Sequence, residues 1–128
     1  MHNVWRRDIM LGGLGFLSMM LVFSGAIQAD QRTFTLDIRE RQVGVTSRTI
    51  RVTQGDAVTI RWTTDEAVAL HLHGYDIETV IKPGAVAEMT SKAHATGRFP
   101  ITSHGFGAHA HSGGHGESTL MYIEVLPR

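Results

Sequence analysis

The 128-residue sequence contains no cysteine. This absence excludes disulfides, thiolate zinc sites, iron–sulfur clusters and a cysteine nucleophile. The sequence also has no net charge, because its 12 lysines and arginines balance its 12 aspartates and glutamates. A neutral chain lacks the basic surface that follows nucleic-acid phosphates, so we expect no nucleic-acid partner. A convincing helical pattern is missing as well, which favours a fold built from strands.

Histidine is the residue type that stands out against these absences. Seven of the eight histidines lie after position 70, and four of them fall between positions 104 and 115. The rest of the composition, 42% hydrophobic and 19% charged, is typical of a globular chain. The length leaves room for one domain.

Residues 1–29 have the features of an export signal. Arg6 and Arg7 precede an uncharged stretch, 9–29, that ends in small residues before Asp30. A positive start, an apolar centre and a small-residue exit are typical of such signals, and the arginine pair resembles a twin-arginine signal. The alternative is a retained membrane anchor, because a segment of this length can just span a bilayer. We therefore expect residues 30–128 to form a domain in the periplasm or at the cell exterior.

Alternating apolar and polar residues predict strands along most of residues 30–128. The expected strands are 34–39, 49–53, 57–63, 67–73, 77–81, 85–93, 99–101 and 120–125. Many short strands without a helix indicate an all-β sandwich or barrel. In the last strand, the alternation places Met121 in the core rather than at a metal.

Three local features refine this strand pattern. The turn at 54–56 predicts that 50–53 and 57–63 are neighbouring strands. Pro100 interrupts the short strand around it, which predicts an edge strand or a bulge. The glycine-, histidine- and serine-rich residues 104–118 are expected to form a loop.

Two histidine clusters are the candidate metal site. His71 and His73 lie two residues apart, so on a strand both imidazoles project from one face. The second cluster lies among glycines that allow a loop to fold closely around an ion; it comprises His104, His109, His111 and His115. Imidazole is the commonest metal ligand, and a nitrogen-only set favours Cu(II), Zn(II) or Ni(II), with affinity highest for copper.

Simpler interpretations stand beside the metal site. A histidine pair on a strand is often a surface or hydrogen-bonded pair, and a loop rich in glycine and histidine can bind metals only adventitiously. His94 has no cluster neighbour and is expected to be a surface or structural residue. Glu117 is either a partner that orients a ligand histidine or an exposed loop acid.

Four segments in order resemble the cupredoxin family over about residues 32–126. They are GDAVTIRW at 55–62, HLHGYD at 71–76, GRFPITSH at 97–104 and MYIEV at 121–125. The resemblance is greatest to bacterial periplasmic cupredoxin-like proteins. It implies a Greek-key β-sandwich with its metal site among loops at one end.

One departure from the blue-copper pattern changes the functional expectation. Ser103 stands where the family's copper-binding cysteine is expected, and without a thiolate there is no intense blue centre and no copper–sulfur path for electron transfer. We therefore expect a periplasmic, non-enzymatic copper carrier, buffer or donor that binds Cu(II), or zinc as the second choice. Its partner would be a copper enzyme or transporter that receives the metal. The alternatives are a metal-free interaction module and a small electron-transfer protein.

Overall fold

The computed structural model describes residues 25, 29–107 and 116–128. Over these residues the chain forms strands, turns and one short 3₁₀ helix, η1 (Val45–Ser47). The strands are β1 (Gln31–Arg39), β2 (Gln42–Val43), β3 (Thr49–Thr53), β4 (Ala57–Thr64), β5 (Val68–Leu72), β6 (Ile77–Ile81), β7 (Ala87–Lys92), β8 (Gly97–Phe106) and β9 (Ser118–Leu126). In this part of the chain, no helix is long and apolar enough to cross a membrane.

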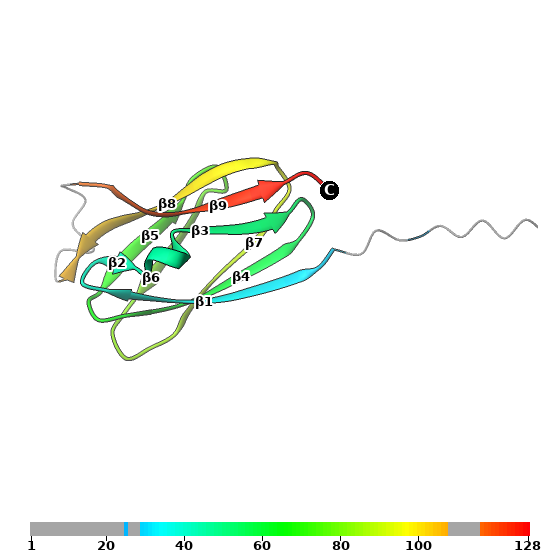
Figure 1. The fold of residues 1–128 in the computed structure, drawn as a ribbon. Coiled ribbons are helices and arrows are strands. Elements are labelled where there is room, and N and C mark those ends of the chain that lie inside the picture. The colour runs from blue at the N-terminus through cyan, green and yellow to red at the C-terminus, as the bar shows by residue number, and fades with distance from the viewer. Residues whose placement is uncertain (1–24, 26–28, 108–115) are drawn as a thin grey trace, which may run out of the picture.

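The strands form two sheets that pack face to face (Figure 1). One sheet has the order β2-β1-β4-β7, and the other has the order β3-β9-β8-β5-β6. The β1–β4 and β3–β9 pairs are parallel, and the other pairs are antiparallel. The expected all-β Greek-key sandwich is therefore confirmed.

The core lies between the sheets and follows the alternation of the sequence. On β4 every second residue from Val58 to Thr64 is buried, and Trp62 among them is fully enclosed. On β5 the inward residues Val68, Leu70 and Leu72 have no exposed surface, so the residues between them must face outward. Met121 is 1% exposed and packs in the core, as its alternation predicts.

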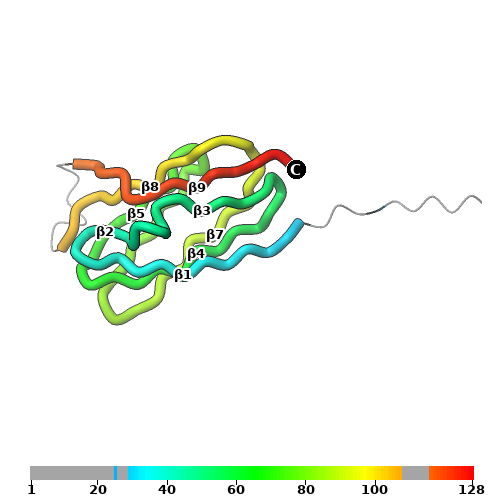
Figure 2. Tube along the Cα trace, in the orientation of Figure 1, coloured from blue at the N-terminus to red at the C-terminus, as the bar shows by residue number. Residues whose placement is uncertain are grey.

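The prediction that residues 50–53 and 57–63 are neighbouring strands is wrong. They belong to β3 and β4, which lie in different sheets although one turn joins them, near the C-terminal end in Figure 2. The backbone of the connecting turn is held from both sheets. The Gln54 N–H donates to the carbonyl of Leu126 on β9, and the Gly55 N–H donates to the carbonyl of Ala93 after β7. Alternation locates each strand, but contacts distant in sequence decide its partner.

Residues 97–106 also differ from the prediction. They form the ten-residue strand β8, which lies between β9 and β5 rather than at an edge, and which extends into the expected loop as far as Phe106. Pro100 is tolerated because its carbonyl accepts from the His73 N–H just beyond the end of β5. The N and C=O of one residue point to the same side of a strand. The Pro100 nitrogen, which has no hydrogen to donate, therefore faces the end of β5. The expected bulge is not at Pro100 either, which stays in register opposite Tyr122; the β8–β9 register shifts between Ile101 and Thr102, and the extra residue lies on β9.

Candidate metal centre

Strand β5 presents His71 on the outer face of the five-stranded sheet. Leu70 and Leu72 on either side point into the core, so the imidazole between them projects outward. His73 follows one residue beyond the strand and keeps the same direction, because its N–H still bonds to β8. The two imidazole rings lie with centroids 4.2 Å apart at an angle of 50°. The expected shared face of His71 and His73 is therefore present.

The turn after His73 depends on glycine. Gly74 has φ +84°, a conformation that L side chains rarely adopt, and a Cβ at this position would lie 2.6 Å from Cδ1 of Phe99. The chain therefore turns sharply against the Phe99 ring directly after the second imidazole. This contact explains why glycine ends the HLHG segment.

Strand β8 adds two further polar groups to the same face. Thr102 lies opposite His71 in the ladder, and His104 lies opposite Ala69. Thr102 is 5% exposed, whereas the His104 side chain is 41% exposed. The His104 ring centroid lies 6.1 Å from that of His71, so this third imidazole borders the pair.

A β-bulge brings Glu117 to this face. Met121 on β9 points into the core, and unbroken alternation would point residues 119 and 117 inward as well. The register instead moves from Ile101 opposite Met121 to Thr102 opposite Thr119, which leaves Leu120 as the extra residue. Because a bulge reverses the side on which the following residues project, Glu117 faces the histidines.

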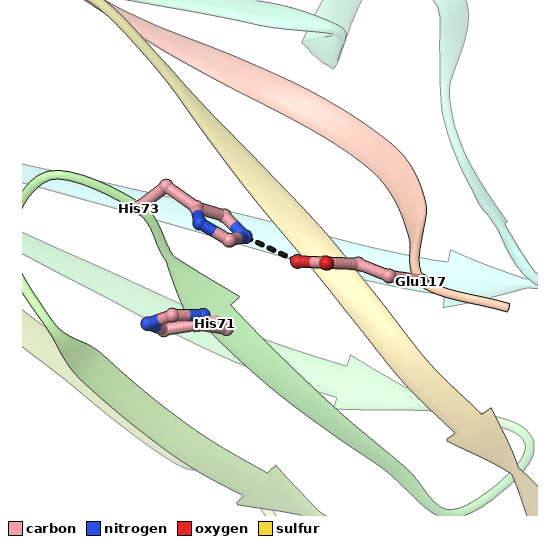
Figure 3. A group of neighbouring side chains, drawn as sticks. All are labelled: His71, His73 and Glu117. Carbon is pink, nitrogen blue, oxygen red and sulfur yellow. Dashed lines mark hydrogen bonds and ion pairs between the residues drawn. The ribbon is translucent and has the colours of Figure 1, made fainter. Parts of the chain in front are cut away.

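Glu117 is the centre of a hydrogen-bond network, of which Figure 3 shows the contact with His73. Its Oε1 accepts a hydrogen bond of 2.6 Å from the Thr102 hydroxyl and pairs with His73 Nε2. Thr102 gives its single proton to Glu117, so its oxygen accepts from His73 Nε2 at 2.9 Å. The network thus assigns the His73 hydrogen to Nε2.

The electrostatics of the cluster favour an ionised Glu117. The pKa of its carboxyl is lowered, first because Thr102 donates a hydrogen bond and then because His73 does, while partial burial opposes the shift. His104 Nε2 lies 3.5 Å from the same oxygen. That contact lacks hydrogen-bond geometry, so this buried nitrogen has no hydrogen-bond partner among the described residues. Buried polar atoms normally have a partner, and a bound ion would supply one.

The donor atoms lie close enough together for a metal ion. His71, His73 and Glu117 each offer one ligand atom, and these atoms all lie within 4.8 Å of one another. Two donors that each lie about 2.1 Å from a shared ion are at most about 4.2 Å apart, so a small side-chain adjustment completes the site. The residues are half-buried, with 21% of His71 and 37% of His73 exposed, which leaves a path for the ion from solvent.

The structure places the six candidate histidines unequally. His71 and His73 lie together and His104 borders them, whereas His109, His111 and His115 lie outside the described residues. That these histidines bind metal stays a prediction. His94 lies elsewhere, edge-on to the Tyr75 ring with centroids 4.6 Å apart, which supports the structural interpretation.

Two residues of the cluster were not predicted as members of it. Thr102 had no role in the sequence analysis, and Glu117 appeared only as a partner or loop acid. The two-residue spacing of Thr102 and His104 indicates that both lie on one face of a strand. The bulge that turns Glu117 toward them is not visible in the alternation of apolar and polar residues. Ser103, at the expected cysteine position, points away from the cluster. It is 3% exposed and donates to the Ser118 carbonyl at 3.3 Å.

Comparisons with known proteins show the fold alone. No family model and no curated protein matches this sequence. Solved structures do match: a multicopper oxidase with TM-score 0.57 and 18% identity, and a copper nitrite reductase from Nitrosomonas europaea with TM-score 0.55 and 19% identity. Each alignment covers 77% of this chain, and respectively 39% and 42% of the other.

A third solved structure, of a heme-copper terminal oxidase dimer, matches with TM-score 0.53 and 21% identity. The alignment covers 76% of this chain and 65% of that one. The chain thus spans less than two thirds of each of these proteins.

Proposed function

We propose that this chain, which has a cupredoxin-like fold, is an exported copper-binding protein that carries, buffers or donates the metal. The observation that supports this function is the meeting of His71, His73 and Glu117 on one sheet face, with ligand atoms within 4.8 Å of one another. Copper enzymes among the solved structures of similar fold support copper as the metal.

The chemistry of the donors supports Cu(II). Imidazole nitrogen and carboxylate oxygen suit Cu(II) and Zn(II), whereas Cu(I) prefers sulfur. The sequence has no cysteine, and Met121 is 1% exposed in the core, on the opposite side of the sheet. We therefore propose capture of copper as Cu(II), with zinc as the competing ion, and weaker binding after reduction to Cu(I).

The side chains of the cluster have different roles in binding the metal ion. His71 and His73 supply nitrogens from β5, and Glu117 supplies the negative charge. Since His73 Nε2 carries a hydrogen toward Glu117 in the metal-free state, this proton leaves to solvent when the ion takes its place. Thr102 holds Glu117 in position throughout. His104 lies at the border, with its Nε2 available as a further donor.

The cellular role follows from the N-terminal segment. We propose that residues 1–29 direct export, so that the domain binds copper in the periplasm and passes it to a copper enzyme or transporter. If the segment is retained as an anchor, the domain works at the membrane surface. We propose binding and transfer of the metal rather than catalysis.

Titration of Cu(II) into the full chain, followed by calorimetry, tests the proposal. We expect one strongly bound ion, and loss of that ion in the double variant His71→Ala/His73→Ala. His94→Ala is the matched control, because it removes an imidazole that packs on Tyr75 away from the cluster. A flat titration, or equal binding by the double variant, excludes copper capture at this site.

A second candidate is a metal-free interaction module. It is favoured by the network of Glu117, Thr102 and His73, which is complete without an ion. Thermal unfolding separates the two functions, because a ligand that binds only the native state raises the Tm. Stoichiometric Cu(II) raises the Tm of a carrier and leaves that of an interaction module unchanged.

A further inference from the structure

A groove of about 510 Å³ lies where β9 runs free of β3. The β3–β9 ladder begins at Thr49 opposite Tyr122, so residues 118–121 of β9 have no β3 partner. β2 from the other sheet contacts β9 and lines the groove with Gln42 and Val43. The buried side chains of Val43 and Met121 form part of the groove lining. Its volume lies within the range of small-molecule sites.

The groove is lined by positive charge, although the chain as a whole is neutral. Three arginines line it, Arg41, Arg48 and Arg98, and none of the described carboxylates does. Arg41 is occupied by a bidentate pair with Glu66. Arg48 and Arg98 form no ion pair with any described residue, since Glu124, which lies opposite Arg98 on β9, pairs with Arg51.

The orientation of Arg98 suits the binding of an anion. Its guanidinium lies over the Tyr122 ring, 3.8 Å from the ring centroid. Stacking fixes the plane of a guanidinium and leaves its N–H edge available for a planar or tetrahedral oxyanion. Thr49, Ser118 and Thr119 also line the groove, and each carries a hydroxyl that can donate a hydrogen bond.

We propose that this groove binds a small oxyanion, a carboxylate or phosphate compound free in solution, through Arg48 and Arg98. Neither arginine belongs to the histidine cluster, although the groove comes close to it at Thr119, which lies opposite Thr102 in the β8–β9 ladder. The proposal does not rest on copper binding, because it is tested on the metal-free chain.

NMR titration of the metal-free full chain tests the proposal, with succinate and inorganic phosphate as probes at constant ionic strength. We expect saturating shifts of the amides of Thr119 and Tyr122 with at least one probe. Since a charge-assisted hydrogen bond contributes about 1.5 kcal/mol or more, Arg48→Gln and Arg98→Gln each weaken binding about tenfold. Succinate binding alone identifies a carboxylate site, and phosphate binding alone identifies a phosphate site.

Arg61→Gln is the matched control, because it removes an arginine paired with Glu88 on the other sheet. We expect it to bind the probes as the unaltered chain does. Shifts that do not saturate, or equal weakening in Arg61→Gln, show only general ionic attraction and overturn the proposal. Saturation by a hexaglutamate peptide without saturation by either small anion also overturns it, in favour of an acidic protein partner.

Discussion

At the scale of the residue, Thr102 controls the cluster without being a natural copper ligand. Its hydroxyl donates to Glu117, accepts from His73 and lies 3.5 Å from the His71 carbonyl. One buried oxygen thus contacts all three residues that offer ligand atoms. Groups that orient ligands in this way change metal affinity although they do not touch the ion.

Thr102→Val removes this hydroxyl while keeping the shape of the side chain. We expect Cu(II) affinity to fall by about tenfold, because Glu117 loses the hydrogen bond that holds its carboxylate toward the histidines. Thr102→Ser restores the hydroxyl and should restore the affinity. Competition with a chelator of known affinity measures both variants. Unchanged affinity in Thr102→Val would remove the positioning role from Thr102.

The cluster also shows what residue spacing can and cannot reveal. The shared direction of His71 and His73 follows from their two-residue spacing alone. Glu117 does not, because alternation back from Met121 points it into the core and only the bulge at Leu120 turns it outward. A bulge depends on the fit between two strands, which a single segment does not encode.

At the scale of the element, the end of β5 is fixed by a turn that strongly favours glycine. Gly74→Ala adds a Cβ that meets Phe99 and strains a backbone with φ +84°. The backbone term alone costs about 1–2 kcal/mol, and the contact with Phe99 adds to it. We expect the free energy of unfolding to fall by about 2 kcal/mol or more, measured by urea denaturation.

Gly84→Ala separates the two contributions to this loss. Gly84 has a similar φ of +80°, but nothing lies within 4 Å of a Cβ there. This variant therefore reports the backbone strain alone, and its loss of stability should be the smaller. Equal losses in the two variants would show that Phe99 moves aside freely.

Strand positions and strand partners differ in how far the sequence determines them. β3 occupies 49–53 as expected, since the alternation of Ile50 and Val52 is local. Its partner is β9 rather than β4, because the turn at 54–56 crosses between the sheets instead of closing a hairpin. The sequence likewise predicts an edge strand or a bulge at Pro100, yet the shortness of β5 gives this residue a place inside the sheet.

At the scale of the whole molecule, Asp56 joins parts of the chain far apart in sequence. Its side chain has no exposed surface, accepts from the Thr53 N–H at 2.9 Å and from Arg128 Nη2 at 2.9 Å, and lies 3.4 Å from Arg32 Nε. These contacts connect the beginning of β1, the turn before β4 and the residues after β9. Loss of this carboxylate charge should therefore affect the cooperative unfolding of the sandwich.

The pH dependence of stability follows from the same contacts. The pKa of Asp56 is lowered, first by the Thr53 hydrogen bond and then by the charges of Arg32 and Arg128, against the opposing effect of burial. In the unfolded chain the carboxyl returns to its ordinary pKa, near 4. A lowered folded pKa adds stability that is complete above this value and is lost as the pH falls toward the folded pKa. We expect the Tm to be constant around neutral pH and to decrease in acid.

Asp56→Asn isolates the contribution of this group, since Glu117 and Asp37 also have lowered pKa values. The variant should have a lower Tm at neutral pH, because Arg32 and Arg128 lose their buried counter-charge. Its Tm should also decrease less in acid than that of the unaltered chain. Asp37→Asn is the control, because its partner Arg39 is exposed and surface pairs contribute little. If both variants lose the same stability across the pH range, Asp56 is no more important than a surface carboxylate, and the sandwich is held together by its apolar core.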